Sequence, residues 1–181
     1  MLTSKRLQHK AFADDDYVRW INMWKDIENQ TLVSDGLVVP RTSLSMEELR
    51  RQVNDDKTYM LYLSITDTSA SKAFAGFASA TKPNARSRQS FLNIVIHKKH
   101  RWLGYETEAV QTVIKHCFEV NAIHRVSLSV SADNHLELEH YKELGFIEEG
   151  RRRAVYWKGP GEWEDIIDLG MLDSDYFGKA T

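Results

Sequence analysis

The sequence has little cysteine and no long apolar run, and each shortage excludes a class of protein. Cys117 is the only cysteine among 181 residues, which excludes an intramolecular disulfide and any zinc site with two or more cysteine ligands. No apolar run approaches the roughly 18 residues that a membrane-spanning helix needs. The first ten residues lack the apolar core of a secretory signal. These absences predict a cytoplasmic protein with no membrane partner.

An excess of charge of one sign is also lacking. The chain carries 24 Lys and Arg against 26 Asp and Glu, a formal net charge of −2, so no overall basic field argues for a nucleic-acid partner. The basic clusters at 97–101 and 151–153 are therefore local features. Arg151, Arg152 and Arg153 alternate faces if they lie in a strand, which favours solvated ion pairs for them.

The length allows one domain with a full core. Hydrophobic periodicity and turn residues predict the order βααβββαβαββ, in which strands stand on both sides of helices. This order is typical of an α/β (α+β layered) fold, and we expect a single domain over 1–181 with a mixed central sheet of about seven strands and about four flanking helices. The expected strands are 6–12, 59–66, 74–81, 89–96, 124–130, 146–157 and 163–172, the expected helices 15–26, 45–53, 105–119 and 135–143, and the expected loop 29–43.

The most informative stretch is HKKHRWLGYETEA at 97–109. It follows a strand-like run at 91–96 and opens the helix at 105–119. A helix start presents unpaired backbone N–H groups and the positive end of the dipole, and Gly104 lets the backbone approach a ligand closely. Together with the basic residues, these features indicate an anion site, most plausibly for phosphate. The alternative is a solvated basic loop.

Four pieces of sequence in this order resemble the GNAT acetyltransferase superfamily. The likeness covers about 90–172 well and the first half only by element order, and it is greatest to the branch with ribosomal-protein alanine N-acetyltransferases and related small-molecule acetyltransferases. The pieces are RWLGYETEA at 101–109, HR at 124–125, DN at 133–134 and YKELGFIEEGRRR at 141–153.

The resemblance implies acetyl-CoA as the cofactor. Backbone N–H groups of the turn at 101–107 would cradle the CoA pyrophosphate, in agreement with the anion site. Backbone groups of 93–96 would pair with the pantetheine amides as a neighbouring strand would, and the family Asn falls on Asn134. The residues so assigned are Asn93, Ile94, Val95, Ile96, Arg101, Trp102, Leu103, Gly104, Tyr105, Glu106, Thr107 and Asn134.

The resemblance also implies a catalytic residue. The family Tyr falls on Tyr141, whose phenol would protonate the departing thiolate as a general acid. Each residue also has a structural alternative. Tyr141 could be an aromatic ring packed on the sheet, and Asn134 could be a helix N-cap without a cofactor contact. The Asn134 side chain could both contact the cofactor and cap the helix.

Three positions depart from the family pattern. Trp102 stands where Gly is common, and Glu106 replaces a small residue, so we expect its carboxylate to point away from the pyrophosphate. Ser129 occupies the place of the carboxylate that acts as base in alanine N-acetyltransferase relatives. The base is left open among Glu28, Asp35, Glu162, Glu164 and a water chain.

The remaining distinctive residues have ordinary explanations. The tryptophans Trp20, Trp24, Trp157 and Trp163 are more typical of core, although one or two could bind an amine through cation–π contact. Cys117 follows the apolar rhythm of its helix, as a small buried hydrophobe does. The spacing of His97, His100 and His116 predicts no metal site.

These patterns predict an acetyl-CoA-dependent N-acetyltransferase, in which a primary amine attacks directly in a ternary complex. A small-molecule amine is slightly preferred to a protein N-terminus as the acceptor, and the protein is expected to be a monomer or homodimer. The alternative is a non-catalytic acyl-CoA-binding regulatory domain on the same fold. A weaker third possibility is a partner-binding module that uses the Trp-rich face.

Overall fold

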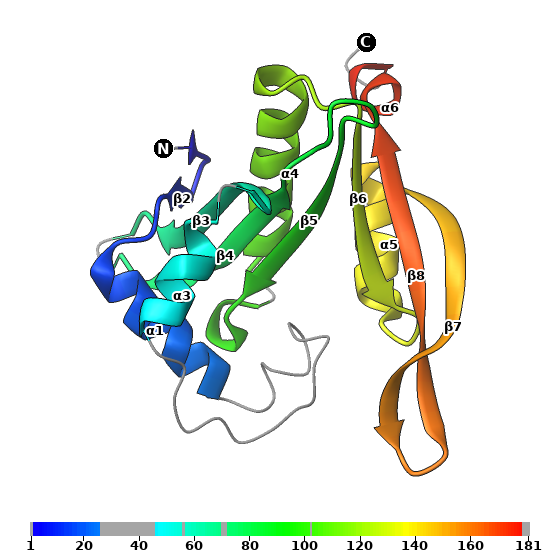
Figure 1. The fold of residues 1–181 in the computed structure, drawn as a ribbon, viewed down its shortest axis with the longest axis horizontal. Helices are drawn as coiled ribbons and strands as arrows, with labels where there is room; N and C mark the ends of the chain where they lie inside the picture. The colour runs from blue at the N-terminus through cyan, green and yellow to red at the C-terminus, as the bar shows by residue number, and fades with distance from the viewer. Residues whose placement is uncertain (1, 26–45, 56, 70–71, 102, 179–181) are drawn as a thin grey trace. The chain divides into compact units, whose positions relative to one another are not determined.

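The computed structural model describes residues 2–25, 46–55, 57–69, 72–101 and 103–178. Eight strands follow the hydrogen-bonded order β1-β2-β3-β4-β5-β6-β8-β7, which confirms the predicted mixed α/β fold with one more strand than expected (Figure 1). By its contacts the chain forms two compact units, Met1–Lys82 with Asn93–Val113, and Pro83–Leu92 with Ile114–Thr181. The single domain stays a prediction.

The first unit contains an antiparallel meander. The strand pairs β1–β2, β2–β3 and β3–β4 are all antiparallel, as the polar linkers between the apolar runs predict. The C-terminal half of β5 belongs to this unit. The strands are β1 (Leu2–Thr3), β2 (Leu7–Lys10), β3 (Tyr59–Asp67), β4 (Phe74–Thr81) and β5 (Gln89–Ile96).

The helices of the first unit are α1 (Asp14–Lys25), α3 (Met46–Val53) and most of α4 (Tyr105–Lys115). Asp16 is buried in the first turn of α1, where its carboxylate accepts the Ala13 N–H at 3.1 Å and the Ser64 hydroxyl at 3.0 Å. A carboxylate at this position caps the helix and suits the positive end of its dipole. The expected loop at 29–43 and the expected Ser45 cap lie outside the described residues.

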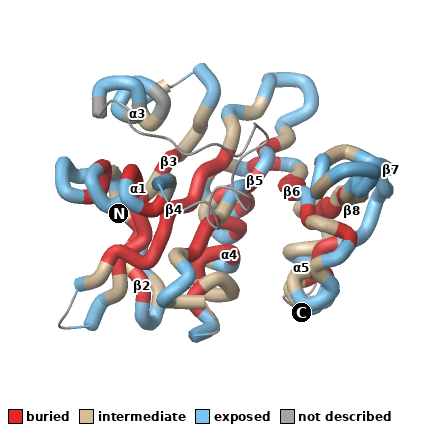
Figure 2. Tube along the Cα trace, turned by 90° about the horizontal axis from the view of Figure 1, so that it is seen from below, coloured by how far each residue is buried: buried red, intermediate tan, exposed pale blue. Residues whose placement is uncertain are grey.

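An aromatic cluster forms the core between α1 and the meander. The ring of Trp20 lies 5.7 Å from that of Phe77, and Tyr62 stacks on Phe77 at 5.6 Å between centroids. All three side chains are buried, and Figure 2 shows the buried residues running along β3 and β4. The core role expected of Trp20 is confirmed, and its aromatic neighbours dominate the burial of this unit.

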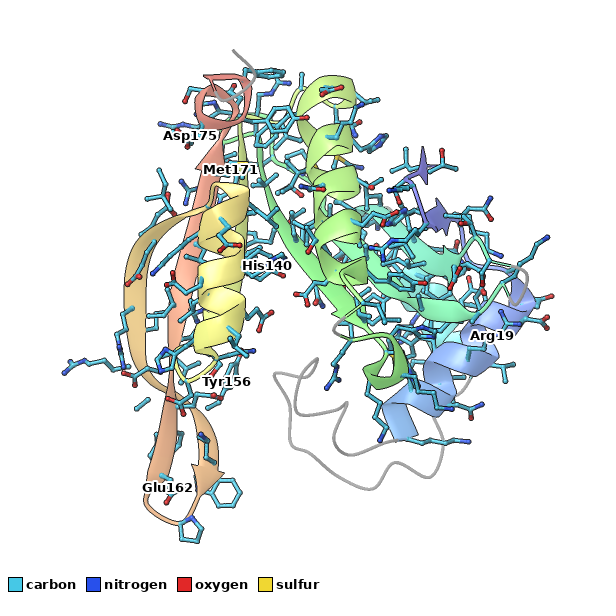
Figure 3. The ribbon with its side chains drawn as sticks, turned by 180° about the vertical axis from the view of Figure 1, so that it is seen from behind. Arg19, His140, Tyr156, Glu162, Met171 and Asp175 are labelled. Atoms are coloured by element: carbon cyan, nitrogen blue, oxygen red, sulfur yellow. The ribbon has the colours of Figure 1, made fainter. Side chains whose placement is uncertain are left out.

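The second unit is a sheet with a helix on one face. The start of β5 pairs in parallel with β6, and β6, β8 and β7 pair antiparallel. Helix α5 lies against one face of these strands in both opposite views (Figures 1 and 3). The elements are β6 (Arg125–Ser131), α5 (His135–Leu144), β7 (Ile147–Gly159), β8 (Glu162–Leu172), α6 (Asp173–Gly178) and the π-helical η2 (His116–Val120).

The hairpin of β7 and β8 corrects one expectation. Trp157 and Trp163 are cross-strand partners, yet they are 62% and 57% exposed, so the core role expected of them is wrong. The reason is the register: β6 pairs with β8 only as far as Ser131 opposite Ile166. The tryptophans lie on the part of the hairpin that continues past this pairing.

Other expectations about the second unit hold. Cys117 is fully buried, and burial raises the pKa of its thiol to about 12, so it behaves as a small hydrophobe. Gly145 ends α5 in the left-handed region with φ 108°. Arg151 and Arg152 form exposed ion pairs with Asp165 and Asp168.

No helix in the described ranges is both long and apolar enough to cross a membrane.

His9 is a buried titratable group of the first unit. It lies on β2 with no exposed surface, opposite Leu2 and Ile65, and neither ring nitrogen has a hydrogen-bond partner of normal geometry among the described residues. Burial lowers the pKa of His9 to about 4, although the Glu108 carboxylate and the Leu2 backbone oppose the shift. The imidazole is therefore neutral at pH 7.

We expect stability to fall as the pH drops from 6.5 to 4. An unfolded His titrates near 6.5, so the unfolded state takes up the proton first, and stability present above pH 6.5 is lost as the pH approaches the folded pKa. The difference of 2.5 pH units corresponds to about 3 kcal/mol. Denaturant titrations at several pH values should show this slope in the wild type and a shallower one in His9→Leu. Equal slopes in both proteins would contradict the assignment, and the exposed His135→Leu is the control.

Candidate active site

The turn before α4 has the geometry of an anion site. After β5 the chain forms the short 3-10 helix η1 (Lys98–His100), and Gly104 then takes φ 73° immediately before α4 begins at Tyr105. The N–H of Glu108 donates to Gly104 O at 3.3 Å. The backbone N–H groups of the first turn of α4 therefore come before this helical bond and lie at the positive end of the helix dipole.

The surroundings of this turn are electropositive. Burial lowers the pKa of His97, and the nearby charges of His100, Lys99, Lys98 and Arg101 lower it further. The Nδ1 atom of His97 accepts the Lys99 N–H at 3.2 Å, which caps η1. Backbone donors and clustered cations together suit a phosphate group.

The strand that leads into the turn packs closely against β4. The N–H of His97 donates to Ala75 O at 2.8 Å, and a Cβ added to Gly76 would lie 1.9 Å from Val95 O. Val95 and Ile96 are buried, whereas Asn93 is exposed. The first unit thus brings the predicted cofactor residues of 93–96 and of 101 and 103–107 together in one strand-turn-helix segment.

Asn134 forms the N-cap of α5. Its Oδ1 accepts the Glu137 N–H at 3.3 Å, and its Nδ2 donates to the Glu137 carboxylate at 2.5 Å. The sequence alternative of a helix cap is therefore present, and a second bond between the two side chains supports it. A role toward the cofactor stays a prediction.

Tyr141 lies on the same helix as Asn134. The separation of seven positions corresponds to about two turns, which places both on one side of α5. The side chain is 4% exposed, and its ring meets that of Phe146 edge-on at 5.6 Å. Packing therefore holds the ring of Tyr141, and its role as general acid stays a prediction.

A carboxylate contacts the position where the family base is missing. The hydroxyl of Ser129 donates to Asp168 Oδ1 at 2.7 Å, across the β6–β8 register. Arg152 donates to both oxygens of Asp168, at 2.8 and 2.9 Å, and to Ser129 Oγ at 3.2 Å. The hydrogen bonds from Arg152 and Ser129 hold the pKa of Asp168 below its usual range, against a smaller effect of burial.

Sequence reasoning missed Asp168. The signal was in the pattern of β8, where residue 168 shares a face with residue 170, but the pairing with Ser129 depends on register between strands far apart in sequence. Of the candidates for the base, Glu164 accepts the Ser131 hydroxyl, and Glu162 lies near the end of the β7–β8 hairpin (Figure 3). Glu28 and Asp35 lie outside the described residues, as do the details of Trp102.

Within the part of the chain that the structure describes, no three His, Cys, Asp or Glu side chains gather as a metal site would require. The orientation expected of Glu106 remains a prediction.

A strand, a glycine turn and a helix start form an anion-binding arrangement of the kind that nucleotide-binding proteins use. A family model for the acetyltransferase (GNAT) domain matches residues 6–147. The chain belongs to the GNAT acetyltransferase domain family.

Two relatives are similar in sequence over part of their length. The chain is 23% identical over 111 residues to the spermidine N(1)-acetyltransferase of Vibrio cholerae, covering 61% of this chain and 64% of that protein. It is 31% identical over 86 residues to the probable N-acetyltransferase YjcK of Bacillus subtilis, covering 48% of this chain and 47% of that protein. The matched stretches thus span less than two thirds of either relative.

Solved structures share the fold along nearly the whole chain. The spermidine N-acetyltransferase of Vibrio cholerae in complex with CoA and spermine has a TM-score of 0.80 at 21% identity, covering 96% of this chain and 99% of that chain. A GNAT-family acetyltransferase from Bacillus anthracis has a TM-score of 0.74 at 19% identity, covering 96% and 98%. At these identities the likeness shows the fold alone.

Gly76→Ala should distort the strand that enters the turn. The new Cβ would overlap the Val95 carbonyl, so β4 and β5 must separate, and overpacking of this kind costs about 1–3 kcal/mol. We expect lower thermal stability and weaker CoA binding by calorimetry. Gly159→Ala is the matched control, because nothing lies within 4 Å of a Cβ there. Equal behaviour of the two variants would disprove the close contact.

Proposed function

We propose that the protein is an acetyl-CoA-dependent N-acetyltransferase that acetylates a primary amine. The observation that carries this function is the strand-turn-helix segment with Gly104 at φ 73° before α4, in a chain of the GNAT family. Its backbone donors and cations suit the diphosphate of CoA. The non-catalytic alternative would use the same segment, so turnover must distinguish the two.

The residues present fit the cofactor that the family implies. The backbone N–H groups of 101–107 would bind the diphosphate, and the backbone of 93–96 would hydrogen-bond the pantetheine amides as an added strand does. Asn134 would contribute a side-chain contact beyond its bond to Glu137. Acetyl-CoA itself supplies an acetyl group that its thioester already activates.

The chain's own groups would then place the amine and move protons. In direct transfer within a ternary complex, the amine nitrogen bonds to the acetyl carbon, the carbon–sulfur bond breaks, and the amine gives up a proton to solvent through a water chain. The Tyr141 hydroxyl would give its proton to the departing sulfur. Asp168, whose pKa is held below its usual range by Arg152 and whose carboxylate is therefore ionised, as an ordinary aspartate is at neutral pH, would accept a hydrogen bond from the amine beside Ser129.

A small-molecule amine is the preferred acceptor. The relative named for spermidine supports this choice over a protein N-terminus, and spermidine is the first amine to test. One similar structure is described as dodecameric, while for this chain monomer or homodimer stays the prediction, as does its location in the cytoplasm.

The function predicts binding of acetyl-CoA and its turnover with an amine. We expect calorimetry to show micromolar binding of acetyl-CoA and of desulfo-CoA, with weaker binding of adenosine 3′,5′-bisphosphate, which lacks the diphosphate. With spermidine present, thiol release should be measurable, and Tyr141→Phe should lower kcat by about 100-fold or more. Tyr176→Phe is the control, because that hydroxyl donates to Glu119 at 2.7 Å in a structural contact.

Binding without turnover across a panel of primary amines would favour the non-catalytic acyl-CoA-binding domain. Absence of binding would remove the enzyme function altogether, and the family likeness would then describe the fold only.

Asp168→Asn should lower kcat/KM for the amine by about tenfold or more, because the substitution removes the charge of a hydrogen-bond acceptor for the amine. The matched control is Asp165→Asn. Asp165 also pairs with an arginine of β7, Arg151 at 2.8 Å, and has a lowered pKa, mainly from the Ala154 N–H, but Asp168 alone of the two contacts Ser129. Steady-state kinetics should separate them, and equal losses in both variants would refute a specific role for Asp168.

A further inference from the structure

The guanidinium of Arg6 contacts the turn before α4 from about a hundred residues away in sequence. Its Nη1 donates to Leu103 O at 2.7 Å. Its Cζ lies 4.9 Å from the centre of the Tyr105 ring, and a Cβ at Gly104 would lie 3.2 Å from its Nη2. One side chain thus touches three consecutive residues where the turn becomes the helix.

Glu108 holds Arg6 in this position. Its Oε2 accepts the Arg6 Nε–H at 2.9 Å. Its Oε1 accepts the Ser4 hydroxyl at 2.6 Å and the backbone N–H groups of Arg6 and Leu7, at 2.5 and 3.2 Å. Hydrogen bonds from Ser4 and Arg6 outweigh the opposing effect of burial and lower the pKa of Glu108. One carboxylate in the first turn of α4 therefore fastens the chain between β1 and β2 to the helix.

Two contacts of Tyr105 also hold this turn. The Tyr105 hydroxyl donates to Asp67 Oδ2 at 2.6 Å, and the His100 ring stacks on Tyr105 at 5.8 Å. The carbonyl of Arg6 in turn accepts the backbone N–H and the hydroxyl of Thr68, at 2.8 and 2.9 Å. Arg6 is thus fixed at both its backbone and its side chain, so it can hold the turn in one conformation.

We infer that Arg6 is a positioning residue for the cofactor, holding residues 103–107 so that their backbone N–H groups converge on the diphosphate. This inference rests on the proposed function, because the turn must bind CoA for its shape to matter. The planar fork of Arg6 donates to a carbonyl and a carboxylate from two different nitrogens held in fixed geometry, whereas a lysine would have to reach both acceptors from one nitrogen on a flexible stem. Loss of the fork frees the Leu103 carbonyl and relaxes the turn.

The test compares acetyl-CoA binding by wild type, Arg6→Ala, Arg6→Lys and Glu108→Gln, at a temperature where circular dichroism shows all of them folded. We expect both Arg6 variants to raise the Kd and the KM for acetyl-CoA by tenfold to a hundredfold, on the order that misplacement of a binding group causes. The KM for the amine should change little. The Kd for adenosine 3′,5′-bisphosphate, which lacks the diphosphate, should also change little.

Arg50→Ala is the matched control, because Arg50 likewise pairs with a carboxylate, Asp14 at 2.5 Å, and lies over an aromatic ring, Tyr17 at 5.5 Å, away from the turn. A wild type that fails to bind CoA would defeat the proposed function itself. A wild type that binds, with Arg6→Ala unchanged in Kd or weakened equally for the bisphosphate, would overturn the inference alone. Full rescue by Arg6→Lys would also overturn it, because charge and not the fork would then suffice.

Discussion

The start of helix α4 is the constraint on which the conformation of the preceding turn in the first unit depends. A helix N-terminus leaves its first backbone N–H groups without helical partners. Gly104, in the left-handed region, turns the chain immediately before these groups. The side chains around it then have one common effect. Arg6, Glu108, Asp67 and Tyr105 hold the turn through hydrogen bonds and ion pairs of their side chains.

The second unit differs from the first, because its polar cluster lies on the face of a sheet. Helix α5 covers one face, and Ser129, Asp168 and Arg152 lie together on another surface, half exposed. An antiparallel sheet tolerates this arrangement, since one face can be solvated. The cross-strand register places the Asp168 carboxylate of β8 beside Ser129 of β6.

Local patterns made much of the fold predictable. The strands at 74–81 and 89–96 were predicted with the bounds observed, because apolar runs bounded by polar linkers specify both ends. The turn at Gly104 and the cap at Asn134 follow from short-range backbone geometry, and both were predicted. The two-residue β1 was not, since so short a strand has no period of its own.

What the sequence could not reveal depends on contacts between distant segments. Asp168 meets Ser129 through strand register, and the exposure of Trp157 and Trp163 follows from where β6 ends, not from their hydrophobicity. Arg6 is the clearest case: in sequence it is one of several basic residues near a strand, at a separation of 97 positions from Leu103. The Glu108 carboxylate sets its position by binding Ser4, Arg6 and Leu7 to helix α4, so a cation that is distant in the chain comes to contact the turn.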